Sequence, residues 1–191
     1  MPDYRDLTPA ILLKAYSIGI FPMAYGRHSG EFDWIEPPKR GIIPLNGLHI
    51  SRSLAKAIRQ NPFTVTYNQA FPEVMEACAS REETWISDDI IRVYTELHRQ
   101  GFADSIECWD KDGMLVGGLY GVRLHHAFFG ESMFSRRTNA SKIALYHLVE
   151  KLKKEGFMLL DTQFITPHLA SLGGIEIPKS EYLALLRKAL S

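Results

Sequence analysis

Three polar residues stand within or at the end of apolar, strand-like segments of the sequence. Glu131 lies between Phe129 and Met133. Asp161 and Gln163 end a second apolar run, two residues apart, so both side chains are expected on the same face of a strand. Carboxylates and amides can bind and orient polar or cationic ligands, which makes these three residues the first candidates for a functional site.

Structural roles could explain the same residues. An Asp at the end of a strand often caps the following turn, and a Glu at a strand end can bond to nearby backbone amides. Residue type and spacing alone leave both interpretations open.

The residues around Glu131 predict a hairpin. Two apolar, aromatic runs meet near His125, which is typical of a strand, a tight turn and a second strand. Glycines at 117, 118, 121 and 130 fall inside these strands, where glycine often marks a bulge or a place where a ligand approaches the backbone. We expect either a site where backbone, carboxylate and the following arginines converge, or a hairpin with its charges in solvent.

Two groups of basic residues could contact a polyanion. Arg52, Lys56 and Arg59 follow i, i+4, i+7 spacing and form one stripe of a predicted helix, for which a solvated face is the alternative. The second group surrounds the start of another predicted helix and consists of Arg136, Arg137 and Lys142. Cations at a helix N-terminus oppose the helix dipole, and a bound phosphate would remove that conflict.

Composition is ordinary for a globular domain. With 22 basic and 22 acidic residues, net charge predicts no polyanionic partner, so any nucleic-acid contact requires a local patch. The two cysteines, Cys78 and Cys108, lack metal-ligand spacing, and we expect neither a disulfide framework nor a metal site. The sequence has no 18-residue apolar run and no signal-peptide pattern, so a cytoplasmic protein is expected.

Capping residues and glycines predict the elements that position these candidates. Helices are expected from Thr8 to Gly19, from Ser51 to before Pro62, and over 71–79, 87–101 and 140–155, with a short helix from Thr166 and a last one from Ser180. Strands are expected over 63–67, 105–109, 114–122, 127–134 and 157–161, and an extended, loop-rich segment over 26–46. Strands flanked by helices in this order favour an α+β fold with a largely antiparallel sheet.

The sequence resembles the leucyl/phenylalanyl-tRNA–protein transferases over nearly its whole length, from about Leu12. The likeness is carried by separate motifs in the same order, at residues 19–23, 49–53, 84–86, 97–107, 117–122, 130–135, 139–142, 161–163 and 171–178. It implies a core resembling the acetyltransferase fold of the GNAT superfamily, with a mostly antiparallel mixed sheet flanked by helices. Residues 1–44 would form a small, shortened N-terminal domain, and 45–191 the GNAT-like catalytic domain.

The resemblance implies an aminoacyltransferase that moves Leu, and also Phe or Met, from aminoacyl-tRNA to the N-terminal amine of proteins beginning with Arg or Lys. Such transfer marks these proteins for degradation by the N-end rule pathway. An ester becomes an amide, which is downhill, so no cofactor is expected, and no membrane contact either. An α-amine has a pKa of about 8, so a usable fraction is neutral near pH 7, and alignment of the two substrates is the main catalytic task.

The family places its catalytic residues on the positions that Asp161 and Gln163 occupy here. An amide oxygen hardly binds a proton, so we expect Gln163 to accept a hydrogen bond from the amine and aim its lone pair at the ester. Asp161 is expected to orient that amide and stabilise positive charge growing on the nitrogen. Glu131 would recognise the acceptor by pairing with its first side chain or its α-ammonium.

The resemblance also implies an apolar pocket for the aminoacyl group and its adenosine. Its candidates are apolar or aromatic residues that are equally typical of a core: Trp85, Met133, Phe134, Phe129, Tyr120 and Trp34. Met23 stands where members often carry an aromatic residue near the terminal adenosine. The basic stripe on the helix from Ser51 is assigned to the tRNA acceptor stem, although Gln60 replaces a further basic residue there.

Two alternatives differ in what they would need. An acyl-CoA-dependent N-acetyltransferase on the same fold would need a glycine-rich pyrophosphate cradle before the helix at 140, but residues 135–140 contain no glycine. A non-catalytic tRNA-binding module would not need Glu131 in the hairpin or the pair Asp161 and Gln163.

Overall fold

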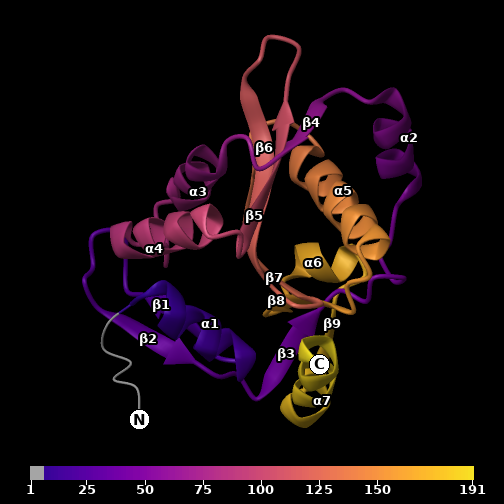
Figure 1. Cartoon of the computed structure of the whole chain (residues 1–191). Helices are drawn as coiled ribbons and strands as arrows, with labels where there is room; N and C mark the ends of the chain where they lie inside the picture. Colours follow the sequence, from indigo (N-terminus) through magenta and orange to yellow (C-terminus); the bar gives the residue numbers. More distant parts are fainter. Residues whose placement is uncertain (1–6) are drawn as a thin grey trace.

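The computed structural model describes residues 7–191 and contains a two-stranded and a seven-stranded sheet (Figure 1). The small antiparallel sheet pairs β1 (Phe21–Ala24) with β2 (Phe32–Ile35). The large sheet has the order β4-β5-β6-β7-β8-β3-β9, and only β7 and β8 run parallel. Its strands are β3 (Lys39–Ile42), β4 (Thr64–Tyr67), β5 (Ala103–Trp109), β6 (Leu115–Leu124), β7 (Ala127–Ser135), β8 (Leu159–Gln163) and β9 (Ile175–Pro178).

Seven helices of the described chain surround the sheets: α1 (Pro9–Ser17), α2 (Arg52–Gln60), α3 (Phe71–Ala79), α4 (Asp88–Arg99), α5 (Ala140–Lys154), α6 (Pro167–Ser171) and α7 (Lys179–Leu190). Hydroxyl side chains cap four of them as expected. Thr8, Ser51, Ser87 and Thr166 each accept a hydrogen bond from a backbone N–H in the first turn. None of the helices within residues 7–191 is long and apolar enough to cross a membrane.

The large sheet carries a core on each face. One core includes buried residues of α1, α3, α4 and α7, and the other is built mainly by α5 with Leu54 of α2. In Figure 1, α3 and α4 lie on one side of the central strands and α5 and α2 on the other. The predicted α+β class with a largely antiparallel sheet is confirmed.

Four short strands lie where no strand was expected. β2 and β3 fall in the segment expected to be loop-rich, and β1 and β9 follow Gly19 and Gly174. Each has only four residues, and β3 contains Arg40 and Gly41, which carry no strand signal. The domain division at residue 44 stays a prediction; β3, which precedes it, pairs with β8 and β9 in the large sheet.

Candidate active site

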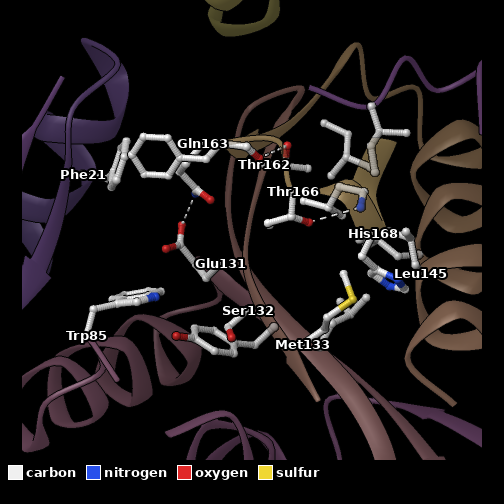
Figure 2. Close-up of a pocket in the computed structure, with 18 of the residues that line it drawn as sticks. Phe21, Trp85, Glu131, Ser132, Met133, Leu145, Thr162, Gln163, Thr166 and His168 are labelled. Atoms are coloured by element: carbon white, nitrogen blue, oxygen red, sulfur yellow. Dashed lines mark hydrogen bonds between the residues drawn. The ribbon is translucent and has the colours of Figure 1, made fainter. Parts of the chain in front are cut away.

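A cavity opens where the two parallel strands part. β7 and β8 are paired only from Ala127 to Phe129 and from Leu159 to Asp161. Beyond these residues, β7 continues alongside β6, and a cavity of about 410 Å³ lies between β7, β8 and α5 (Figure 2). Gln163 and Glu131 point toward one another at one end of it, and Met133 and Leu145 lie at the other.

Glu131 reaches the cavity because of a β-bulge. In the register of β6 and β7, Tyr120 is opposite Ser132 and Gly121 is opposite Gly130, so Glu131 has no partner across the strands. A Cβ atom at position 121 would collide with the carbonyl oxygen of Phe129, so glycine is required there. The expectation that glycine marks a bulge is confirmed for Gly121 and Gly130, and the bulge directs a carboxylate at the cavity.

The Glu131 carboxylate is held by two side chains that are far away in sequence. Its Oε1 accepts hydrogen bonds from the Tyr16 hydroxyl at 2.6 Å and from Nε2 of Gln163 at 3.0 Å. Tyr16 is in turn hydrogen-bonded to the hydroxyl of Tyr94 in α4. Glu131 is therefore held by side chains rather than by the nearby backbone amides that a purely structural role would use.

Burial raises the pKa of Glu131 to about 8; the nearby Asp161 carboxylate adds to this rise, while the bond from Tyr16 and the charge of Arg40 oppose it. Burial, together with the charge of Glu131, also raises the pKa values of Tyr16 and Tyr94 well above their ordinary range. Both tyrosines therefore stay neutral near pH 7, and Glu131 changes its charge close to that pH.

Gln163 has a left-handed backbone, with φ at 59°, which is rare for residues other than glycine, Asn and Asp. Its backbone N–H donates to Oδ1 of Asp161 at 2.7 Å, which stabilises this conformation. With Nε2 bonded to Glu131, the amide oxygen of Gln163 stays available to a ligand in the cavity. Strained backbone at such a place is typical of functional sites.

Asp161 does not line the cavity. Its carboxylate is fully buried and accepts bonds from Nε and Nη2 of Arg40 and, at 2.7 Å, from the Tyr182 hydroxyl. Gln163 lines the cavity whereas Asp161 does not, and the positive φ at Gln163 departs from regular strand backbone. Asp161 acts on Gln163 through the backbone N–H, not through the side-chain amide.

Sequence reasoning missed Arg40, Tyr16, Tyr94 and Tyr182. They lie between 21 and 121 residues away from the groups that they contact. The one visible sign in the sequence was an arginine two residues before the apolar residues 42–45. Arg40 is the largest fully buried side chain of the described structure, and its guanidinium also lies over the rings of Phe21 and Tyr182.

Four of the seven pocket candidates line the cavity: Met23, Trp85, Tyr120 and Met133. The other three do not. Phe129 packs behind it against Tyr16, with ring centroids 4.7 Å apart, Phe134 borders a second cavity, and Trp34 packs edge-on against Phe32. Further apolar walls that the sequence did not single out are Phe21, Ile43, Leu119, Leu145, Leu148, Leu160, Phe164 and Leu169.

The Tyr120 hydroxyl is unusual within residues 7–191, because it is the one buried side-chain polar atom there without a hydrogen-bond partner. Its ring packs edge-on against Phe71 and Tyr94. Burial, with the charge of Glu131, raises its pKa well above the ordinary range, so the hydroxyl is neutral.

The predicted basic residues lie outside the cavity. Arg52, Lys56 and Arg59 are exposed on α2, which packs beside α5 (Figure 1), and none of the three forms an ion pair within residues 7–191. Arg136 and Arg137 are exposed between β7 and α5, and Lys142 is partly buried in the first turn of α5. The described residues contain no cluster of His, Cys, Asp and Glu that could hold a metal ion.

Comparison with known proteins finds similar sequences over nearly the whole chain. The profile of the family "leucyl/phenylalanyl-tRNA protein transferase" matches residues 42–187, and that of its N-terminal domain matches residues 5–38. A protein named leucyl/phenylalanyl-tRNA–protein transferase from Cereibacter sphaeroides is 56% identical over 185 residues, which cover 97% of this chain and 86% of that protein. One of the same name from Rhizorhabdus wittichii is 57% identical over 190 residues, covering 97% and 76%.

Among solved structures, FemX has a similar fold, with a TM-score of 0.59 and 11% sequence identity. The match covers 87% of this chain and 66% of the FemX chain. At this identity the likeness concerns the fold alone.

Proposed function

The chain belongs to the leucyl/phenylalanyl-tRNA–protein transferase family, and we propose that it moves leucine, phenylalanine or methionine from aminoacyl-tRNA to proteins that begin with Arg or Lys. It is an aminoacyltransferase, and tRNA and protein are its substrates. The observation that best supports the finer proposal is the bond between Gln163 and Glu131 at the cavity wall. It puts an amide and a carboxylate side by side where an ester and an amine can meet.

The reaction exchanges an ester for an amide. The neutral N-terminal amine attacks the ester carbonyl carbon, a C–N bond forms, and the C–O bond to the terminal ribose breaks. The nitrogen loses a proton and the ribose oxygen gains one, so atoms and charge balance. Because no group has to be activated first, holding the amine and the ester in line supplies most of the rate enhancement, through effective molarities worth roughly 7–11 kcal/mol.

Gln163 aligns the amine. Its Nε2 donates a hydrogen bond to Glu131. Its oxygen therefore accepts a hydrogen bond from an N–H of the amine and directs the nitrogen lone pair at the carbonyl carbon. Asp161 contributes by fixing the backbone of Gln163 through its hydrogen bond from the Gln163 N–H. Asp161 is a positioning residue in this scheme because its carboxylate is taken up by Arg40 and Tyr182.

The aminoacyl side chain occupies the apolar end of the cavity, against Met133, Leu145 and Leu148. A wall of leucine and methionine side chains accepts leucine, phenylalanine or methionine because it adapts to each shape and has no polar group to satisfy. Trp85 and Met23 contact the terminal adenosine. Phe129, Phe134 and Trp34 support this pocket from behind or beside it.

The tRNA body contacts the basic residues outside the cavity. Arg52, Lys56 and Arg59 on α2 bind phosphates of the acceptor stem, and the second group, Arg136, Arg137 and Lys142, binds the backbone nearer the 3′ end. Phosphate contacts of this kind make binding fall steeply as salt rises.

Three further expectations belong to the same proposal. Residues 45–191, which carry six of the seven strands of the large sheet, form a GNAT-like catalytic domain, and residues 1–44 form a small N-terminal domain before it. The enzyme works in the cytoplasm. Its product carries a new N-terminal residue that marks the protein for degradation by the N-end rule pathway.

A transfer assay tests the proposal directly. The protein is incubated with leucyl-tRNA and a peptide that begins with Arg, and mass spectrometry should find a peptide extended by one leucine at its N-terminus. Acetyl-coenzyme A replaces leucyl-tRNA in a parallel reaction. An acetylated peptide there would favour the N-acetyltransferase, and tRNA binding without transfer to any peptide would favour a non-catalytic binding module.

Glu131→Gln is expected to remove most of the preference for an Arg-initiated peptide over one that begins with citrulline, which has the same shape without the charge. A charge-assisted hydrogen bond is worth about 1.5–3 kcal/mol, so the preference of the unaltered enzyme should be about 10- to 100-fold in kcat/KM. Glu131 is neutral below its pKa of about 8 and charged above it. The preference should therefore grow as pH rises through 8.

Both peptides share the same α-amine, so its own titration cancels from this ratio. Glu181→Gln, at an exposed position of α7, is the matched control and should keep the full preference. The carboxamide that replaces Glu131 can still accept the bond from Tyr16, so the Glu131→Gln variant should fold normally. An equal preference in the unaltered enzyme and this variant would contradict the recognition role.

A further inference from the structure

A second cavity, of about 480 Å³, lies next to the first. The two have three lining residues in common: Arg81, Met133 and His168. Any ligand that leaves the first cavity on this side therefore passes Arg81 and enters the second.

The second cavity has a cationic and hydroxylic lining. Arg81 and Arg136 contribute guanidinium groups, and Ser80, Ser135 and Ser141 contribute side-chain hydroxyls. No carboxylate is among the lining residues. Beside the apolar side chains of Ala77, Met133 and Phe134, these polar groups fit an anion and disfavour a cation.

Arg81 and Arg136 also lack a carboxylate partner anywhere in residues 7–191. In the same part of the chain, five other arginines pair with Asp or Glu, namely Arg27, Arg40, Arg92, Arg99 and Arg123. Arg81 donates instead to the carbonyl oxygen of Met133, and Arg136 donates to that of Leu115 at 3.2 Å, with its guanidinium over the Phe134 ring. These contacts orient each guanidinium while leaving most of its five N–H donors unused.

The tRNA substrate carries an anionic group at about the position where the second cavity adjoins the first. When the aminoacyl ester lies in the first cavity, the next charged group along the tRNA is the phosphodiester that joins the terminal adenosine to the nucleotide before it. A guanidinium binds phosphate in a bidentate manner through two parallel N–H donors.

We propose that the second cavity binds this phosphodiester, and that Arg81 and Arg136 are its main ligands. The inference rests on the proposed function and makes it more specific, because it assigns to Arg81 a role in binding the donor that sequence reasoning did not foresee. The proposal also distinguishes two places where the tRNA is bound. The second cavity binds one phosphate next to the terminal adenosine, and α2 binds the acceptor stem.

Two minimal donors test the proposal. Leucyl-adenosine carries no phosphate, whereas leucyl-CpA, the leucyl ester of cytidylyl-(3′→5′)-adenosine, carries only the phosphodiester in question. The unaltered enzyme should have a KM for leucyl-CpA about 10-fold or more below that for leucyl-adenosine, since a charged hydrogen bond is worth about a factor of 10. Arg81→Ala and Arg136→Ala should each shrink this ratio toward one, and the Lys variants should keep part of it.

Arg187→Ala is the control, because Arg187 is exposed on α7, lines neither cavity and has no carboxylate partner within residues 7–191. The ratio of its KM values for leucyl-adenosine and leucyl-CpA should match that of the unaltered enzyme. If the unaltered enzyme uses both donors with the same KM, or if both alanine variants keep the full ratio, the phosphodiester site is refuted while the transfer activity stands. If neither donor nor leucyl-tRNA supports transfer, the proposed function itself is refuted, and this inference with it.

Discussion

Asp161→Asn is expected to lower the free energy of unfolding by about 3–5 kcal/mol, the cost of leaving one member of a buried ion pair without its partner. Asp161 and Arg40 are both almost completely buried, and their closest N–O distance is 2.7 Å. Asparagine of nearly the same size would leave the Arg40 guanidinium without a counter-charge. Urea denaturation of the two proteins measures the difference.

Two further variants isolate the ion pair. Asp89→Asn removes the carboxylate of an exposed pair with Arg92 and should cost less than about 1 kcal/mol. Adding Arg40→Met to Asp161→Asn should restore part of the lost stability, because no unpaired charge then remains buried. A loss below about 1 kcal/mol in Asp161→Asn alone would mean that Arg40 is not held mainly by Asp161.

Gln163→Ala and Gln163→Glu are both expected to lower kcat/KM for leucyl transfer by about 100-fold, the usual effect of losing substrate alignment. Alanine removes the hydrogen-bond acceptor for the amine. Glutamate keeps an acceptor for the amine but removes the N–H donor that faces Glu131. The second carboxylate repels that of Glu131 and raises the pKa of Glu131 further. Steady-state kinetics with leucyl-tRNA and an Arg-initiated peptide give the values.

Gln163→Asn is the matched control for the length of the side chain. Asparagine tolerates the left-handed backbone at this position and keeps the carboxamide, but it is one methylene shorter. It should therefore fold at least as well as the unaltered enzyme and still lose activity. If Gln163→Glu proved faster than the unaltered enzyme, general-base catalysis would replace alignment as the explanation.

Local chemistry made much of the fold predictable. Thr8, Ser51, Ser87 and Thr166 start helices as capping residues do, and the turn at His125 joins the two strands of the expected hairpin. These signals need only a few neighbouring residues. The strands of residues 21–42 were missed because they are short and owe their place to pairing with distant partners.

The candidate site was predictable in its residues but not in their contacts. Glu131 and Gln163 were recognisable as polar groups in apolar surroundings, and they do meet. The left-handed backbone of Gln163 was not predictable, since glutamine carries no preference for it. Nor was the partner of Asp161, because Arg40 is 121 residues away and lies in a strand without a sequence signal.

Arg40 also ties the beginning of the described chain to its end. Besides Asp161 in β8, its guanidinium bonds the carbonyl oxygen of Gly19 after α1 at 2.7 Å and lies 4.5 Å from the centre of the Tyr182 ring in α7. Phe21, which covers the guanidinium from β1, is itself a wall of the first cavity. Detaching α1 and β1 would strip a buried cation of contacts that hold it in place, so these segments should open only when the whole domain unfolds, and the cavity keeps its wall for as long as the protein is native.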